Sequence, residues 1–226
     1  MGAPELDAFV RALTDGHRVL LLGGLAVIAH GLARATKDAD VWLDPLASTE
    51  AWAGALFEAG RAFPKVRMAR LPGWTPVETV EEIAEAADET GIIRVLGLEC
   101  PLDVFRRPNE LEELDFDAVW SRATPKEDGV YLPDPTDLLV SKSDTGRDRD
   151  NADIQFLEAK LRTDLGARLK TATRAEAEAI FARYADHVVA TKALENPDPA
   201  VQALAREILE GFAAQGDPFA RDALGL

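Results

Sequence analysis

Residues 21–44 read LLGGLAVIAHGLARATKDADVWLD. Residues 18–22 (RVLLL), apolar after Arg18, have the length of a short buried strand and end at Gly23-Gly24, where a turn is expected. The pattern then favours a helix from residue 25 to about residue 33 and a second strand over residues 37–43. Burial accounts for the apolar side chains of this unit, but it does not account for two aspartates at the start of the second strand.

Asp38 and Asp40 are two residues apart in the second strand, and side chains two apart point to the same side of a strand. Trp42 shares this side, while the opposite side carries Ala39, Val41 and Leu43. The Cα atoms of the two aspartates would lie about 6 to 7 Å apart. Their carboxylates could therefore hold one hard divalent cation, or two close ones.

Chance is the competing explanation, because an acidic chain contains Asp-x-Asp pairs for no functional reason. The pattern recurs at Asp115/Asp117, in a helical context, and at Asp148/Asp150, in a charged stretch. The pair at residues 38 and 40 differs from both because it opens a strand whose alternate side is apolar. Asp44 would lie about 13 Å beyond Asp40 at ~3.3 Å per residue, too far to share a cation with it.

Gly23 and Gly24 give the turn a second possible role. Glycines let backbone amides approach a ligand closely, and a helix N-terminus favours an anion. A tight turn without a ligand explains them equally well. The stretch GGLAVI matches neither the dinucleotide fingerprint G-x-G-x-x-G nor the P-loop G-x-x-x-x-G-K-[ST].

The composition limits the classes of partner. The chain has 226 residues, of which 40 are acidic and 25 basic, for a formal charge of −15. This field repels nucleic acid and anionic membranes, so extended nucleic-acid binding is not expected. The single cysteine excludes an internal disulfide, and the apolar runs are too short to span a bilayer. With no signal peptide in the N-terminal residues, these features favour a cytoplasmic protein.

The rest of the chain predicts strands in its first part and helices in its last third. Helices are expected at residues 4–14, 49–59 and 111–122, and the acidic stretch of residues 77–90 is expected to form a short exposed helix. Extended segments are expected at residues 92–98, 102–105 and 130–132. Thr173 and Glu176 form a capping-box pattern ahead of a helix to about Leu194, and Asp198-Pro199 starts another to about residue 214. We expect an α+β fold with a core at residues 1–160 and a helical extension at 161–226.

Residues 20–44 resemble the nucleotidyltransferase superfamily, which has the DNA polymerase β-like fold. The resemblance lies in a hydrophobic strand followed by Gly23-Gly24, a helix, and the alternating Asp38-Ala39-Asp40-Val41 on the next strand. The sequence GGLAVIAHGLARATKDADV resembles the corresponding segment in a bacterial and archaeal branch of this superfamily, the minimal-nucleotidyltransferase-like and antitoxin-like proteins. The likeness is looser from residue 45 to about residue 160 and does not extend to the tail. It implies a mixed sheet flanked by helices.

The family implies a third carboxylate on a later strand with hydrophobic flanks. Asp103, within PLDVF, fits this position best, and Glu99 is a rival for it. The resemblance also assigns Lys142 and Arg147, within LLVSKSDTGRDRD, to the neutralisation of triphosphate charge. A solvated surface charge is the alternative for both basic residues.

Three further residues of the glycine–aspartate unit have structural roles in this interpretation. His30 lies on the helix that the glycines start, and we expect it to be a hydrogen-bonded structural histidine rather than a base. Arg34 and Thr36 are expected to brace the strand that carries the aspartates.

The activity implied by the resemblance is metal-dependent transfer of a nucleoside monophosphate from an NTP to an unidentified acceptor hydroxyl. Asp38, Asp40 and Asp103 would hold Mg²⁺ or Mn²⁺, and Gly23 and Gly24 would position phosphates. A second interpretation is a non-catalytic module with the same fold, the antitoxin-like partner of a toxin, and a phosphohydrolase using the same metals is a third. A homodimer formed by the C-terminal helices is also compatible with the sequence.

Overall fold

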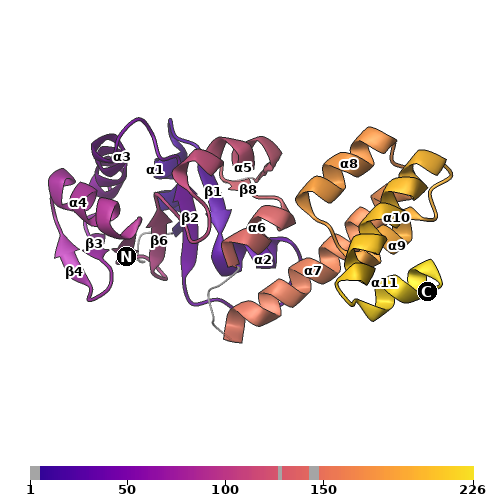
Figure 1. The fold of residues 1–226 in the computed structure, drawn as a ribbon. Coiled ribbons are helices and arrows are strands. Elements are labelled where there is room, and N and C mark those ends of the chain that lie inside the picture. Colours follow the sequence, from indigo (N-terminus) through magenta and orange to yellow (C-terminus); the bar gives the residue numbers. More distant parts are fainter. Residues whose placement is uncertain (1–5, 127–128, 143–147) are drawn as a thin grey trace. The chain divides into compact units, whose positions relative to one another are not determined.

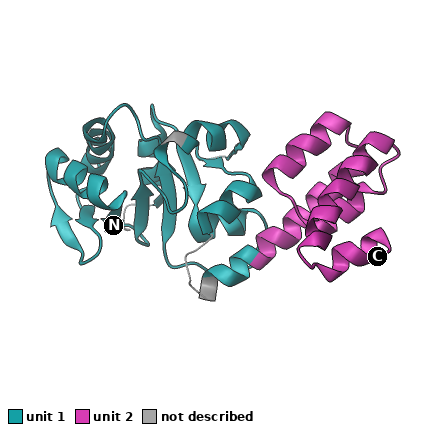
Figure 2. Cartoon of the chain, viewed as in Figure 1, with its two compact units in different colours: residues 1–154 teal, residues 155–226 magenta. Residues whose placement is uncertain are grey.

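A computed structural model describes residues 6–126, 129–142 and 148–226. It contains two compact units, residues 1–154 and residues 155–226 (Figure 2). The helix α7 (Asp148–Leu169) contains the division between them. The boundary that we placed at residue 160 lies within the same helix.

Unit 1 is built on a mixed sheet, which has eight strands within the described residues, in the order β4-β3-β5-β6-β2-β1-β8-β7. Strand β2 lies at its centre, antiparallel to β1 and parallel to β6, and β6 is antiparallel to β5. The strands are β1 (Val19–Leu22), β2 (Ala39–Leu43), β3 (Arg67–Arg70), β4 (Thr75–Val77), β5 (Ile92–Leu96), β6 (Leu102–Phe105), β7 (Thr124–Pro125) and β8 (Tyr131–Leu132).

Helices pack on both sides of this sheet (Figure 1). On one side, α1 (Leu6–Thr14), α3 (Thr49–Arg61) and α4 (Val80–Thr90) form the main core with the strands. On the other side, α2 (Gly23–Ala29) contacts β1, β2 and α6 (Pro135–Lys142). The main core includes the fully buried side chains Phe9, Leu13, Trp52, Leu56 and Ile83.

The alternation of β2 follows from this packing. Ala39, Val41 and Leu43 are buried in the main core, as predicted. Asp40 faces the other side and is partly exposed. Trp42 is buried on that side, where its ring meets the ring of Phe116 edge-on at 5.0 Å. The side of β2 opposite the main core therefore carries a polar residue, Asp40, near its start and a buried aromatic residue, Trp42, near its end.

The segment between α3 and β6 contains structure that its sequence did not predict. Strands β3 and β4 form a hairpin, although residues 61–76 are interrupted by proline and glycine. The acidic stretch is a helix, α4, but it is not merely an exposed one, because its residues Ile83, Ala84, Ala86 and Ala87 are buried. The helix expected at residues 111–122 begins as a 3₁₀ turn, η1 (Glu113–Asp115), and continues as α5 (Phe116–Arg122).

Unit 2 is helical and has its own core. It holds the second part of α7, then α8 (Arg174–Arg183), α9 (His187–Ala193), α10 (Pro199–Ala214) and α11 (Pro218–Leu224). The capping box of Thr173 and Glu176 is confirmed, as is the start of a helix at Asp198-Pro199. The single helix expected up to residue 194 was wrong, because Asp186 accepts hydrogen bonds from the backbone amides of Val188 and Val189 and so starts α9.

The fold class expected from the sequence is confirmed as a mixed sheet flanked by helices, followed by a helical C-terminal part. In the part of the chain that the structure describes, no helix combines the length and apolar character needed to cross a membrane.

Candidate active site

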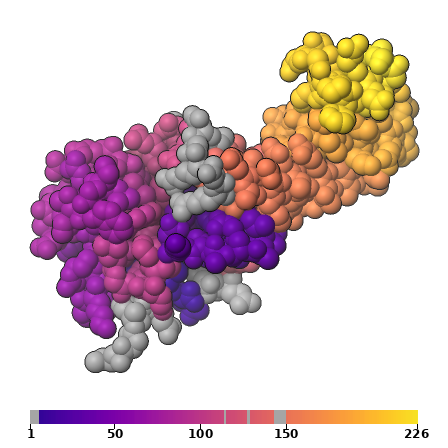
Figure 3. Space-filling view, turned by 90° about the horizontal axis from the view of Figure 1, so that it is seen from below, coloured from indigo at the N-terminus to yellow at the C-terminus, as the bar shows by residue number. Residues whose placement is uncertain are grey.

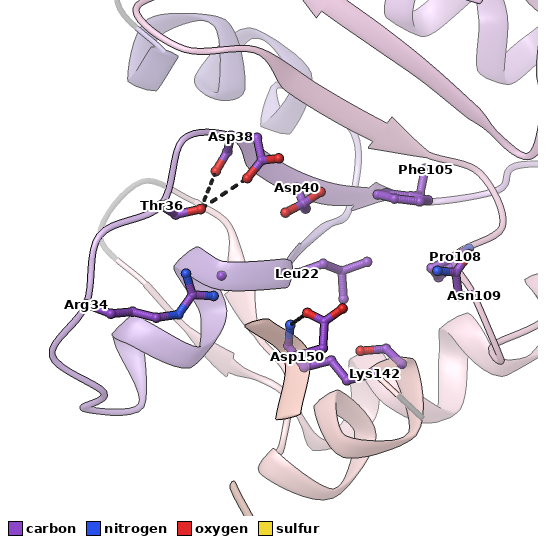
Figure 4. Close-up of a pocket in the computed structure, with 13 residues that line it drawn as sticks. Leu22, Arg34, Thr36, Asp38, Asp40, Phe105, Pro108, Asn109, Lys142 and Asp150 are labelled. Atoms are coloured by element: carbon purple, nitrogen blue, oxygen red, sulfur yellow. Dashed lines mark hydrogen bonds and ion pairs between the residues drawn. The ribbon is translucent and has the colours of Figure 1, made fainter. Parts of the chain in front are cut away.

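Asp38 is the residue before β2 and Asp40 is the second residue of the strand, so β2 begins later than the strand expected from residue 37. Asp40 is paired with Leu22 of β1 on one side and with Asp103 of β6 on the other. Asp38 is oriented by Thr36, whose hydroxyl oxygen lies 3.1 Å from both the Asp38 carboxylate and its backbone carbonyl (Figure 4). Thr36 therefore braces the aspartate strand by fixing the carboxylate of Asp38.

A side chain at Gly23 would collide with Asp40 of this strand, and one at Gly24 would collide with the loop that precedes it. Gly23 has a φ of +57°, and a Cβ atom built on it would lie 1.9 Å from a carboxylate oxygen of Asp40. A Cβ atom on Gly24 would lie 2.6 Å from a guanidinium nitrogen of Arg34 and 2.9 Å from the hydroxyl of Thr36. The glycine corner thus brings the backbone at the start of α2 directly against Asp40, where any larger residue would displace the carboxylate.

A pocket of about 100 Å³ lies beside the glycine corner. Asp38 and Asp40 stand on one side of it, and Lys142 and Asp150 stand on the other (Figure 4). Phe105, Pro108 and Asn109 form a further part of the wall. The pocket therefore places the carboxylates of Asp38 and Asp40 across a small space from Lys142 and its partner Asp150, and Arg34 also lines it.

The basic residues that line the pocket, Arg34 and Lys142, form ion pairs with Asp150 and Asp153 near the start of α7. Asp153, whose side chain is fully buried, binds Arg34 through both of its oxygens, at 2.8 and 2.7 Å. Lys142 lies 2.8 Å from Asp153 and 3.3 Å from Asp150. Arg34 comes from the loop between α2 and β2, which lies with α2 (violet) on the surface of unit 1 in the view from below (Figure 3).

Asp150 and Asp153 were not predicted from the sequence as parts of the site. Asp148/Asp150 was treated as a control in a charged stretch, yet Asp150 lines the pocket. The usable signal was the spacing of Asp150 and Asp153, because residues three apart lie on one face of a helix. Together with Lys142, they form a buried network of alternating charge.

Asp103 lies on the same face of the sheet as Asp40, directly opposite it in the parallel pairing of β2 and β6. Both oxygens of its carboxylate are bound by Arg94 of β5, at 2.6 and 2.5 Å. Asp103 is buried and is not part of the pocket wall. Within residues 6–126, 129–142 and 148–226, no three His, Cys, Asp or Glu side chains are arranged to hold one metal ion.

The other residues that the sequence singled out have identifiable contacts or lie outside the described residues. Glu99, the rival of Asp103, accepts a hydrogen bond from the backbone amide of Leu6 at 2.6 Å. The Nε2 atom of His30 lies 2.9 Å from the carbonyl oxygen of Pro133, consistent with a structural histidine. Arg147 lies outside the described residues.

Negative charge dominates the electrostatics around the aspartates. The pKa of the Cys100 thiol is raised, first by burial and then by the charges of Glu99, Asp38 and Asp40. The pKa of Arg94 is also raised, mainly by its hydrogen bonds to Asp103 and further by Asp38 and Asp40. In both cases the charges of Asp38 and Asp40 make the smaller contributions, and both act in the direction expected of nearby negative charge.

Among solved structures, the chain has similarity to a nucleotidyltransferase-like protein. The chain matches no family model and no curated protein. It is similar to the crystal structure of a provisionally assigned nucleotidyltransferase from H. pylori, with 17% sequence identity, a TM-score of 0.40, and coverage of 92% of this chain and 93% of that chain. A TM-score of 0.40 is too low to infer a function from this similarity. The function is therefore inferred from the residues of the site.

Proposed function

We propose that this protein is a metal-dependent nucleotidyltransferase, which moves a nucleoside monophosphate from an NTP to an acceptor hydroxyl. The observation that supports this best is the pocket in which Asp38 and Asp40 stand opposite Lys142, beside the glycine corner. Carboxylates and a basic residue around one small space suit a phosphate chain that arrives with a divalent cation. The net charge of −15 makes the cation necessary, because the carboxylates alone would repel phosphates.

The residues present fit one hard divalent cation, Mg²⁺ or Mn²⁺. Asp38, just before β2, and Asp40, within it, supply hard oxygen donors to the same pocket, and Thr36 fixes the orientation of Asp38. The absence of a side chain on Gly23 makes room for the Asp40 carboxylate. Asp103 is the third carboxylate of this face, and in the structure it is bound to Arg94.

In this proposal each residue acts on a different part of the nucleotide. A bound cation would neutralise phosphate charge and lower the pKa of the attacking hydroxyl. Gly23 and Gly24 bring backbone amides to the β- and γ-phosphates, and Leu22, the residue at the N-cap of α2, has no side-chain group that could accept their hydrogen bonds. Lys142 stabilises negative charge on the departing pyrophosphate, exchanging its contact with Asp150 for one with phosphate. Arg147, which is not among the described residues, would help Lys142 to neutralise the phosphate charge.

The size of the pocket limits what it would enclose. Sites that surround a whole small molecule measure roughly 300–1,000 Å³, whereas this pocket measures about 100 Å³. We therefore expect it to receive the phosphate groups, with the nucleoside lying outside. This arrangement would give phosphate contacts a larger part in binding than contacts with the base.

A second candidate function is a non-catalytic interaction module, the antitoxin-like partner of a toxin. One observation favours it, namely that Arg94 binds both oxygens of Asp103 and so removes a carboxylate that catalysis by two metals would need. In that case unit 2, or a dimer formed through it, would provide the partner surface.

Label transfer distinguishes the two candidates. The full chain is incubated with each NTP, labelled on the α-phosphate, and with Mg²⁺ or Mn²⁺, in the presence of separated pools of cellular small molecules, RNA and proteins. We expect label in one pool, with release of pyrophosphate, and no transfer by Asp38→Asn or Asp40→Asn. Asp117→Asn is the matched control, because Asp117 also belongs to an Asp-x-Asp pair but is exposed and bound to Arg18. Absence of transfer into every pool would favour the non-catalytic module.

A further inference from the structure

Arg94 and Asp103 form a buried ion pair beside the proposed metal site. The two residues are directly paired across the antiparallel strands β5 and β6. The guanidinium binds the carboxylate through two hydrogen bonds, and the exposed fractions of the two side chains are 17% and 8%. Such a two-point contact is the strongest form of an arginine–carboxylate pair, and it uses both oxygens.

Asp103 stands between Arg94 and Asp40 in the sheet. It is paired with Asp40 on β2 and with Arg94 on β5, and neighbouring strands lie about 5 Å apart. All three side chains therefore lie on one face, and the guanidinium lies within the field of Asp38 and Asp40 as well. Arg94 is the positive charge that balances the third carboxylate of this face.

Trp74 holds Arg94 from the tip of the hairpin formed by β3 and β4. Its ring lies over the guanidinium, with 4.8 Å between the ring centroid and the Cζ atom of Arg94. Trp74 has a φ of +63°, an unfavourable conformation for a bulky residue, and 51% of its surface is exposed. Backbone outliers of this kind cluster at functional sites, and the ring of Trp74 contacts the guanidinium of Arg94.

We propose that Arg94 competes with a second divalent cation for Asp103, so that the site without nucleotide binds one cation. This inference rests on the proposed function, in which Asp38 and Asp40 bind the first cation. A cation at Asp103 would need the carboxylate oxygens that Arg94 now binds, and its charge would repel the guanidinium. The site gains its second cation only when Arg94 leaves Asp103. Arg94 is thus a positioning residue that sets the number of bound metal ions.

Metal stoichiometry tests this inference without any measurement of activity. The full chain is titrated with Mn²⁺ in the absence of nucleotide, and bound ions are counted by calorimetry and by the electron paramagnetic resonance of free Mn²⁺. We expect one ion in the wild-type protein and two in Arg94→Gln. Adding Asp103→Asn to Arg94→Gln should restore a single ion. Two ions in the wild-type protein, or one in Arg94→Gln, would overturn the inference while the proposed function stands.

The same titration separates failure of the inference from failure of the proposed function. A wild-type protein that binds no Mn²⁺ would overturn both, because the first ion belongs to Asp38 and Asp40. Arg94→Gln leaves Asp103 buried without its partner, so circular dichroism must first establish that this variant folds. If it does not fold, Arg94→Lys replaces it, since lysine keeps the charge but cannot bind both oxygens in the same way. We then expect a second, weaker ion in Arg94→Lys, and a single ion would overturn the inference.

Discussion

The backbone of Gly23 lies so close to Asp40 that a methyl group on Gly23 would stand 1.9 Å from an oxygen of the Asp40 carboxylate. The corner between β1 and α2 and the side of β2 that carries Asp40 are therefore in direct contact. Each determines the position of the other, because neither the backbone nor the carboxylate has room to move toward its neighbour.

Gly23→Ala is expected to displace Asp40 and to destabilise the fold. The left-handed backbone alone should cost about 1–2 kcal/mol, and the contact with the carboxylate adds to this cost. Urea unfolding measures the change in the free energy of unfolding, and Mn²⁺ titration measures the loss of the cation. Gly54→Ala in α3 is the control, because a Cβ atom there meets nothing within 4 Å and should leave stability unchanged or slightly raised. Equal behaviour of the two variants would contradict the proposed contact.

Cys100 provides a chemical probe of the charge on Asp38 and Asp40. Their negative charges contribute to the raised pKa of its thiol, after the larger effect of burial. The thiolate is the reactive form, so any loss of this negative charge lowers the pKa and speeds alkylation at a fixed pH near 8. We expect Mg²⁺, Asp38→Asn and Asp40→Asn each to increase the rate of alkylation by iodoacetamide.

The alkylation experiment has a built-in control. If Mg²⁺ acts through the two aspartates, it should accelerate alkylation in the wild-type protein but have little effect in the Asp38→Asn/Asp40→Asn double variant. Acceleration of the same size in both proteins would mean that the metal acts elsewhere.

Asp153 is expected to be a major determinant of stability in unit 1. Its buried carboxylate binds Arg34 and Lys142, and Asp153→Asn would leave both cations without this partner. Removing one member of a buried ion pair costs about 3–5 kcal/mol. Asp164→Asn is the control, because Asp164 forms a half-exposed pair with Lys160 and should change the free energy of unfolding by no more than about 0.5 kcal/mol. If Asp153→Asn and Asp164→Asn unfold at the same temperature, the ion pairs of Asp153 with Arg34 and Lys142 do not stabilise the fold.

The sequence predicted the parts of the fold that depend on local pattern. The alternation of β2 and the caps at Thr173 and Asp198 each rest on neighbouring residues, and all are confirmed. The glycine corner leads into a helix as expected, but that helix begins at Gly23 itself and ends at Ala29 rather than running from residue 25 to about residue 33. The hairpin of β3 and β4 was not predicted, because its strands are short and β3 is held in place by its pairing with β5. Such pairing depends on residues distant in the sequence, which a local pattern does not contain.

In the site, too, the residues that are close together in the sequence were predicted, and the partners that come from distant elements were not. Asp38, Asp40, Gly23 and Gly24 belong to one short segment, and the structure brings them together at one pocket. The partners of Asp103 and Lys142 could not be predicted from spacing alone, because each is fixed by a neighbouring element. Arg94 is brought to Asp103 by the register of β5 and β6, and Asp153 is brought to Lys142 by the packing of α7.

Nucleotide binding measured with and without Mn²⁺ tests most directly whether Asp38 and Asp40 hold the cation that brings phosphates to the pocket. Equilibrium dialysis of the full chain against each of the four NTPs should show binding of at least one of them that requires the metal. Asp38→Asn and Asp40→Asn should each weaken this binding by at least about tenfold, equivalent to about 1.4 kcal/mol, and Asp117→Asn should not. Binding that persists without Mn²⁺, binding that is unaffected by either aspartate substitution, or no binding of any NTP would contradict the account.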